Sequence, residues 1–294
     1  MSEQTPQRVW FITGCSTGLG KVLAETALRA GHQVVATARK PEQIANLASL
    51  YGDRALVLTL DVTSQASIDA AVEAAIARFG RIDVLVNNAG YGIAGAIEEV
   101  AEQEFMPMFD TNVFGLLRVT KAVLPQLRKQ RSGHVLNLSS IGGLVGGAGI
   151  GYYNATKFAV NGLSEALAAE LAPLGVRVTV IEPGPFRTDF LGRSGVRAAL
   201  ELDDYVETAG KMRAYFADND GKQAGDPVKA AEAMIAVVES ANPPRHLLLG
   251  KSAYARWTAR LEQWNDELAG WKDTTLNADF RDDTASSSAK TEAR

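Results

Sequence analysis

The sequence is poor in the residues that build disulfides and metal sites. Its 294 residues include one cysteine, Cys15, and three histidines, His32, His134 and His246. A single cysteine excludes an internal disulfide and a cysteine-rich metal centre. The histidines are far apart along the chain, and none has a carboxylate at metal-ligand spacing, so we expect no metal site.

The chain also lacks an excess of positive charge and a long apolar run. Its net charge of -4 excludes the basic field that is typical of nucleic-acid-binding proteins. No apolar run approaches the ~20 residues that span a membrane. The polar start MSEQTPQ leads directly into an apolar segment, unlike a secretory signal peptide. We therefore expect a cytoplasmic protein with neither nucleic acid nor membrane as a partner.

Short apolar segments alternate with segments of helical periodicity. Strands are predicted at 8–14, 33–39, 55–62, 82–90, 133–140, 176–184 and 245–250. Helices are predicted at 19–31, 41–52, 64–80, 102–130, 152–172 and 226–240, followed by an amphipathic helix to about 269. This alternation predicts an α/β fold, a doubly wound parallel sheet of the Rossmann type, with about seven strands and helices on both faces.

No break in composition and no internal repeat divides the chain. Residues 1–280 are therefore predicted to form a single domain. Within it, residues 185–225 follow no regular pattern and are the expected substrate loop. The polar end, residues 281–294, has few apolar side chains and is predicted to be a disordered tail.

A glycine-rich turn, TGCSTGLG at 13–20, joins the first strand to the first helix. Gly14, Gly18 and Gly20 allow a sharp turn and a close approach of the backbone to a ligand. The helix start behind them offers free N–H groups and the positive end of a dipole, which suit a pyrophosphate. Its place between strand and helix favours a dinucleotide site over a merely structural turn.

The stretch YYNATK at 152–157 sets two tyrosines before a lysine. Only Tyr153 stands four residues before Lys157, so only these two share a helix face. A lysine ammonium beside a phenol would lower the tyrosine pKa and allow proton exchange near neutral pH. Tyr152 points elsewhere and is expected to pack. The spacing alone does not separate a catalytic pair from a chance one.

The motifs together resemble the single-domain short-chain dehydrogenases/reductases. The resemblance rests on TGCSTGLG, on Asp61-Val62, on NNAG at 87–90, on DTNVFG around Asn112, on Ser140 and on PGPFRT at 183–188. After about residue 190 the chain looks most like bacterial proteins grouped with 17β-hydroxysteroid dehydrogenases. The resemblance implies a catalytic set of Asn112, Ser140, Tyr153 and Lys157. It implies cofactor contacts from Gly14, Ser16, Thr17, Gly18, Leu19, Gly20, Arg39, Lys40, Asp61, Val62, Asn88, Ala89, Gly90, Tyr153, Lys157, Pro183, Gly184, Phe186 and Thr188.

This resemblance implies a dinucleotide-binding and catalytic domain that interconverts a ketone and a secondary alcohol. Tyr153 would transfer the proton and Ser140 would hydrogen-bond the same oxygen. Lys157 would lower the tyrosine pKa and hold the ribose, and Asn112 would position a water. The alternatives are a non-catalytic dinucleotide-binding regulator, and an epimerase or dehydratase, against which the glycine spacing argues.

The end of the second predicted strand, ATARKPEQ, indicates the cofactor. An NAD site in this architecture places an acid there, whereas this chain has Thr37 and Ala38 followed by Arg39 and Lys40. An arginine can bind the 2′-phosphate of NADP with a charge-assisted fork. Some relatives carry a basic residue where this chain has Thr17. We therefore predict NADP (NADPH), with NAD less favoured.

The expected substrate walls lie in loops at the carboxyl ends of the strands. They are Tyr91, Ile93, Leu144, Val145, Ile150, Phe190 and Leu191. Because these side chains are mostly apolar, a hydrophobic or aromatic small molecule is the expected carbonyl or alcohol substrate. The resemblance also implies a homodimer or homotetramer packed through the helices near 102–130 and 152–172.

Overall fold

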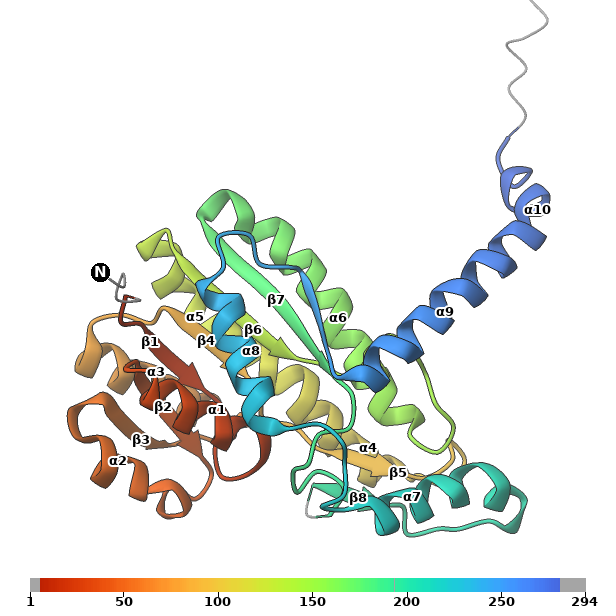
Figure 1. Cartoon of the computed structure of the whole chain (residues 1–294), viewed down its shortest axis with the longest axis horizontal. Helices are drawn as coiled ribbons and strands as arrows, with labels where there is room; N and C mark the ends of the chain where they lie inside the picture. The colour runs from red at the N-terminus through yellow and green to blue at the C-terminus, as the bar shows by residue number, and fades with distance from the viewer. Residues whose placement is uncertain (1–5, 193, 281–294) are drawn as a thin grey trace, which may run out of the picture.

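Seven parallel strands form the central sheet of the computed structural model (Figure 1), in the order β3-β2-β1-β4-β6-β7-β9. The structure describes residues 6–192 and 194–280, so the tail predicted at 281–294 lies outside the described residues. The strands are β1 (Val9–Ile12), β2 (Gln33–Ala38), β3 (Ala55–Thr59), β4 (Val84–Asn87), β6 (Gly133–Leu138), β7 (Val176–Pro183) and β9 (His246–Leu249). The predicted doubly wound sheet of the Rossmann type is confirmed.

Helices cover both faces of this sheet. One face packs against α1 (Gly18–Arg29), α2 (Asn46–Tyr51) and α8 (Pro227–Glu239). The other packs against α3 (Gln65–Phe79), α5 (Leu116–Gln130) and α6 (Gly151–Leu171). Successive residues of a strand point to opposite faces of the sheet. Trp10 and Ile12 pack in the core on the α1 side, and Val9 and Phe11 pack in the core on the α3 side. Burial on both faces explains why the strands are continuously apolar.

Two predicted helices are interrupted in the structure. Residues 41–52 form a 3₁₀ turn, η1 (Pro41–Ile44), followed by α2 and a second turn, η2 (Gly52–Arg54). Residues 102–130 form α4 (Glu102–Phe109), a π-helical segment η3 (Asp110–Gly115) and α5. The apolar periodicity runs through η3, so the sequence pattern gave no sign of this widened turn, a feature that is frequent at functional sites.

The predicted substrate loop is partly regular. It contributes β8 (Gly195–Arg197), which pairs in parallel with β5 (Gly92–Ala94) to form a second, two-stranded sheet. Two short turns follow, η6 (Asp203–Tyr205) and η7 (Val206–Gly210), and then α7 (Lys211–Asn219). In Figure 1 this segment lies beside β5, beyond the ends of the central strands. The sequence did not predict β5 or β8, because strands of three residues are too short to show a period.

The remaining elements are two short turns and a pair of C-terminal helices. The turns are η4 (Ile141–Gly143) and η5 (Ala172–Leu174), and the helices are α9 (Lys251–Gly270) and α10 (Lys272–Leu276). Helix α9 leaves the body of the molecule and projects away from it (Figure 1).

Among the residues that the structure describes, no helix is both long enough and apolar enough to cross a membrane.

Candidate active site

A cavity of about 1000 Å³ lies at the carboxyl edge of the central sheet. Loops after β1, β2, β3, β4, β6 and β7 form its walls, as expected for a ligand site in an open parallel sheet. The predicted site residues that line it are Gly14, Ser16, Thr17, Gly18, Leu19, Arg39, Asp61, Val62, Asn88, Ala89, Gly90, Tyr91, Ile93, Ser140, Ile150, Tyr153, Lys157, Pro183, Gly184, Phe186, Thr188, Phe190 and Leu191.

The glycine turn is fastened to the segment after β4. The Thr13 hydroxyl accepts hydrogen bonds from the backbone N–H groups of Asn88 (2.9 Å) and Ala89 (3.1 Å). The Asn88 side-chain amide in turn donates to the carbonyls of Thr13 (2.8 Å) and Gly14 (3.0 Å). Gly14 has φ +72, and a Cβ there would lie 2.9 Å from the Ala89 Cα. Both the conformation and the contact require glycine.

Gly20 does not line the cavity, although the resemblance placed it among the cofactor contacts. A Cβ at this position would overlap the Asn88 side chain and lie 2.5 Å from the Gly14 carbonyl oxygen. Gly20 therefore lets α1 pack closely on the turn, which is the usual role of the last glycine in such a motif.

The start of α1 faces the cavity through Gly18. Thr17 precedes it in an extended conformation without a side-chain cap, and the first turn has no acidic residue. Free N–H groups and the positive dipole end favour an anion at this place. A Cβ on Gly18 would have only Thr188 nearby, at 3.9 Å, so the backbone is open to a ligand. These features fit the pyrophosphate of a dinucleotide.

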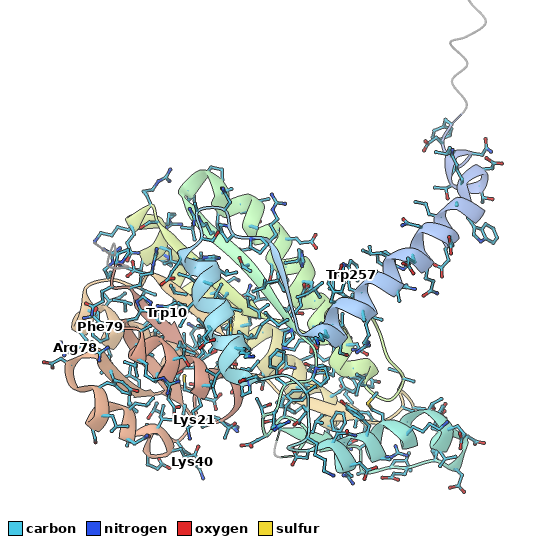
Figure 2. All side chains as sticks on the ribbon, in the orientation of Figure 1. Trp10, Lys21, Lys40, Arg78, Phe79 and Trp257 are labelled. Carbon is cyan, nitrogen blue, oxygen red and sulfur yellow. The ribbon has the colours of Figure 1, made fainter. Side chains whose placement is uncertain are left out.

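Arg39 extends into the cavity from the end of β2. Burial alone would raise the pKa of Asp61, but hydrogen bonds from Thr63 and the positive charge of Arg39 hold it below its ordinary value. Thr63 donates to Asp61 Oδ1 from its backbone N–H (2.9 Å) and its hydroxyl (2.7 Å). Lys40 does not line the cavity, because successive side chains of an extended segment point to opposite sides. Figure 2 shows Lys40 at the outer edge of the molecule, near α2.

The predicted catalytic side chains meet at the far side of this cavity. Tyr153 and Lys157 come from α6, and Ser140 follows β6. The Lys157 ammonium lies 5.7 Å from the centre of the Tyr153 ring and donates to the Leu138 carbonyl at 2.7 Å. The Ser140 Oγ accepts from the backbone N–H of Gly142 at 3.0 Å, and its proton can be directed to Pro183 O at 3.5 Å. The three groups thus share one wall.

Burial controls the protonation of this pair. It raises the pKa of Tyr153 to about 12, with a smaller opposing effect of the Ser140 hydroxyl. It lowers the pKa of Lys157 to about 8. The pKa of Tyr153 is thus raised, where the sequence predicted a lowered one, because desolvation of the buried phenolate is the largest effect on it. The phenol is held in its protonated form.

Asn112 lies in η3 and is buried behind the cavity rather than lining it. Its Oδ1 accepts from the Tyr91 backbone N–H at 3.0 Å, and its Nδ2 donates to the Tyr91 carbonyl at 2.8 Å and to the Thr156 hydroxyl at 3.1 Å. The side chain therefore joins the loop after β4 to α6. Both Nδ2 hydrogens are used in these bonds, whereas Oδ1 accepts only one and keeps a second lone pair, so the predicted positioning of a water by Asn112 stays a prediction.

The neighbours Tyr152 and Ser139 have packing roles. The Tyr152 ring stacks on Phe105, with centroids 4.2 Å apart and planes within 8°. The Ser139 hydroxyl donates to the Lys157 backbone carbonyl at 3.2 Å and so supports α6. The spacing argument that preferred Tyr153 over Tyr152 agrees with this placement.

The substrate end of the cavity is mostly apolar. Tyr153 packs against Phe190, with ring centroids 5.5 Å apart. Leu144 and Val145, expected in the wall, do not line it. Their backbone N–H groups both bond to Ile141 O (3.1 and 2.9 Å), which coils the segment and leaves Ile141 facing the cavity instead.

Sequence reasoning missed several lining residues. They are Ala38, Leu60, Thr63, Gly92, Pro107, Asp110, Thr111, Leu138, Ser139, Ile141, Pro185, Ser194, Val196, Met212, Tyr215, Phe216, Gln223, Ser252 and Arg256. Those at strand ends could be found from the rule that ligands sit at carboxyl ends. Those after residue 193 have no local motif, since only the folded chain brings α7 and α9 to the cavity.

Comparison with known proteins agrees with the geometry. The short chain dehydrogenase family profile matches residues 8–197. The chain is 40% identical over 272 residues to oxidoreductase BOA17 of Botryotinia fuckeliana, covering 92% of this chain and 98% of that one. It is 38% identical over 244 residues to a 3-ketodihydrosphingosine reductase of Bacteroides thetaiotaomicron, covering 83% and 88%.

A solved structure extends the agreement to the whole fold. A short-chain dehydrogenase from Streptomyces avermitilis superimposes with a TM-score of 0.88 at 41% identity, covering 94% of this chain and 100% of that one. The predicted motif order, the sheet and the sequence relatives thus agree. The chain belongs to the single-domain short-chain dehydrogenase/reductase family of oxidoreductases, whose fold binds a nicotinamide dinucleotide.

Proposed function

We propose that this protein is an NADP(H)-dependent oxidoreductase that interconverts a ketone and a secondary alcohol on a hydrophobic or aromatic substrate. The observation that carries the proposal is the convergence of Ser140, Tyr153 and Lys157 on a cavity that also contains the glycine turn. A dinucleotide-binding regulator would not need this set. The retained Tyr153 and Lys157 therefore favour turnover.

The chemistry assigned to the chain is proton transfer and oxyanion stabilisation. A bound nicotinamide supplies or accepts the hydride. In the reductive direction, negative charge develops on the carbonyl oxygen. The protonated Tyr153 hydroxyl donates its proton to this oxygen, and Ser140 donates a hydrogen bond to it. The buried Lys157 favours the phenolate that remains, because its charge is little screened there.

The cofactor proposal depends on Arg39. It lines the cavity at the end of β2, where Thr37 and Ala38 stand in place of an acid, and its charge acts on the nearby Asp61 and Tyr91. A guanidinium so placed can bind a 2′-phosphate, which an acid would repel. Lys40 faces away from the cavity, so the proposal assigns the phosphate to Arg39.

The substrate proposal depends on the apolar end of the cavity. Ile93, Ile150, Phe190 and Leu191 line it as predicted, and α7 adds Met212, Tyr215 and Phe216. Such a wall favours a hydrophobic or aromatic ketone over a highly charged metabolite. Among the described residues, the cationic side chains that line the whole cavity are Arg39, Lys157 and Arg256.

The test compares two adjacent phenols. Tyr153→Phe should lower kcat for NADPH-dependent ketone reduction by about 10²–10⁴, the usual contribution of a general acid, with NADPH affinity unchanged. Tyr152→Phe, the matched control, should change kcat less than about threefold, since its ring packs on Phe105. Turnover is followed as loss of NADPH absorbance across a panel of hydrophobic ketones. Loss of turnover in Tyr152→Phe alone would contradict the assignment.

Two further predictions of the sequence belong to the proposal. Residues 1–280 act as a single dinucleotide-binding and catalytic domain in the cytoplasm. The domain forms a homodimer or homotetramer through the segments 102–130 (α4, η3 and α5) and α6, and exposed apolar side chains on α4, η3 and α6 support this. They are Met106, Phe114, Phe158 and Leu163, with exposed fractions of 46%, 47%, 43% and 37%.

A further inference from the structure

Helix α9 has an apolar face that, from Leu261 onward, is exposed in the described part of the chain. The helix contacts the body near its start, mainly against β9 and η4, and Ala253 is buried there. Residues 261–270 are all exposed. Figure 2 shows Trp257 where the helix leaves the body, and the rest of α9 extends beyond it. Most helices of this length bury one face.

The apolar residues of α9 follow a heptad spacing that continues one residue past its end. Intervals of three and four alternate through Tyr254, Trp257, Leu261, Trp264, Leu268 and Trp271. Tyr254, Leu268 and Trp271 are 69%, 63% and 67% exposed. Single exposed apolar residues are ordinary, but a continuous stripe of this kind marks an interaction surface. The spacing is that of a coiled-coil seam.

The charges on α9 are divided between its two halves. Lys251, Arg256 and Arg260 lie in the first half, and Glu262, Asp266 and Glu267 lie in the second. A second copy of the helix running antiparallel would set each basic half against an acidic half. A parallel copy would set like charges together. The charges therefore favour an antiparallel over a parallel pairing of two copies.

We propose that α9 pairs antiparallel with α9 of a second copy of this chain. The stripe is self-complementary in this direction. When Leu261 lies opposite Trp264 of the second copy, the same register sets Trp257 opposite Leu268 and Tyr254 opposite Trp271. All six stripe residues are then used in each copy: two kinds of layer pair an indole ring with a leucine, and the third pairs Tyr254 with Trp271.

The flank of the stripe agrees with this register. Arg260 lies beside the seam, with its guanidinium carbon 4.7 Å from the Trp264 ring centre. Glu267 lies seven residues further, on the same flank. In the antiparallel pair, Arg260 of each copy faces Glu267 of the other. This interface is separate from the one proposed for α4, α5 and α6.

Other occupants fit the stripe less well. Residues 281–294 contain no Val, Ile, Leu, Met or aromatic residue, so they cannot fill a seam of indole rings. A helix that binds anionic lipid carries excess positive charge on its polar face. The three basic and three acidic residues of α9 cancel instead. A second copy is the occupant that satisfies both the stripe and the charges.

The first experiment measures mass by light scattering on the full chain. Leu261→Glu combined with Leu268→Glu should halve the mass of the assembly, because each copy would place two carboxylates in an apolar seam. Ala259→Glu is the control, since this exposed position lies on the opposite face of the same helix. An unmodified protein that is monomeric, or a mass unchanged by the double substitution, would overturn the proposal.

The second experiment tests direction by charge exchange. Arg260→Glu and Glu267→Arg should each weaken self-association through α9 by about tenfold or more, as repulsion replaces attraction in both pairs. The two variants mixed together should associate again, as should the chain that carries both changes. No recovery on mixing would overturn the antiparallel register. The full chain is also tested for binding to vesicles of phosphatidylcholine and phosphatidylserine. If the seam substitutions abolish such binding while the mass stays constant, the choice of a second copy as the partner of α9 is overturned.

Discussion

A buried ion pair holds the substrate segment against the body, and its removal should have a measurable cost. Glu99, 1% exposed, follows β5, and Arg213, 7% exposed, lies on α7. Arg213 Nη1 donates to Glu99 Oε2 at 2.6 Å, and the backbone N–H groups of Ala96 (2.7 Å) and Leu202 (2.9 Å) donate to the same carboxylate. The substitution Glu99→Ala removes all three bonds.

The expected loss follows from what the substitution leaves behind. Removing one member of a buried pair typically costs about 3–5 kcal/mol, because the remaining charge is desolvated without a partner. Arg213 keeps one contact, its Nε lying 3.3 Å from the more exposed Glu201 carboxylate. This contact offsets part of the loss. We therefore expect Glu99→Ala to lower the free energy of unfolding by about 3 kcal/mol, the lower end of that range.

The assay is denaturant unfolding of the variant beside a matched neighbour. Glu98→Ala removes an exposed carboxylate that accepts from the Tyr205 hydroxyl at 2.6 Å. It should cost less than about 1 kcal/mol, since water replaces an exposed partner. Glu99→Ala should also raise KM for a hydrophobic ketone, because α7 supplies Met212 and Tyr215 to the cavity. Equal losses in the two variants would refute the reasoning.

The pH dependence of this pair has a definite sign. Burial would raise the pKa of Glu99, but the Leu202 and Ala96 N–H groups and Arg213 together hold it below its ordinary value. A carboxyl with a lowered folded pKa stabilises the protein above its unfolded pKa of about 4.3. That stabilisation is lost as pH falls through the lower folded value. The difference between the unmodified protein and Glu99→Ala should therefore persist at neutral pH and shrink below about pH 4.

Three further predictions concern the proposed cofactor side of the cavity and a half-buried histidine. Arg39→Ala should raise KM for NADPH about tenfold or more with NADH kinetics little changed, and an equal effect on both would show that Arg39 does not contact the phosphate. Gly20→Ala should cost about 1–3 kcal/mol and weaken dinucleotide binding, measured by fluorescence titration, because its Cβ would overlap Asn88. Hydrogen bonding to Glu182 raises the pKa of His246. The protonated histidine therefore stabilises the folded protein fully below the unfolded pKa of about 6.5, and this stabilisation is lost as pH rises through the folded pKa. His246→Gln should remove this slope from unfolding curves measured between about pH 6 and 8, and an unchanged slope would count against it.

Sequence reasoning was most successful where one segment carries its own signal. The strands could be predicted because residues buried on both faces are continuously apolar, as Trp10 and Phe11 are. The glycine-rich turn could be predicted because positive φ and close packing demand glycine at Gly14. Sequence reasoning did not predict η3, β5 or β8. A π segment and a three-residue strand leave no period, and tertiary bonds such as those from Asn112 to Tyr91 define them.

The sequence by itself determined the fold class, the glycine turn after β1 and the placement of Tyr153 and Lys157 on one helix face, because periodicity, glycine requirements and residue spacing are properties of short segments. Only the tertiary structure decided which residues after 193 reach the cavity, since contacts such as that between Glu99 and Arg213 join segments more than a hundred residues apart. It also decided the direction in which the pKa of Tyr153 is shifted, because burial depends on every element packed around the phenol. It showed, finally, that the stripe on α9 faces solvent, because a heptad pattern does not reveal whether the body of the protein already covers it.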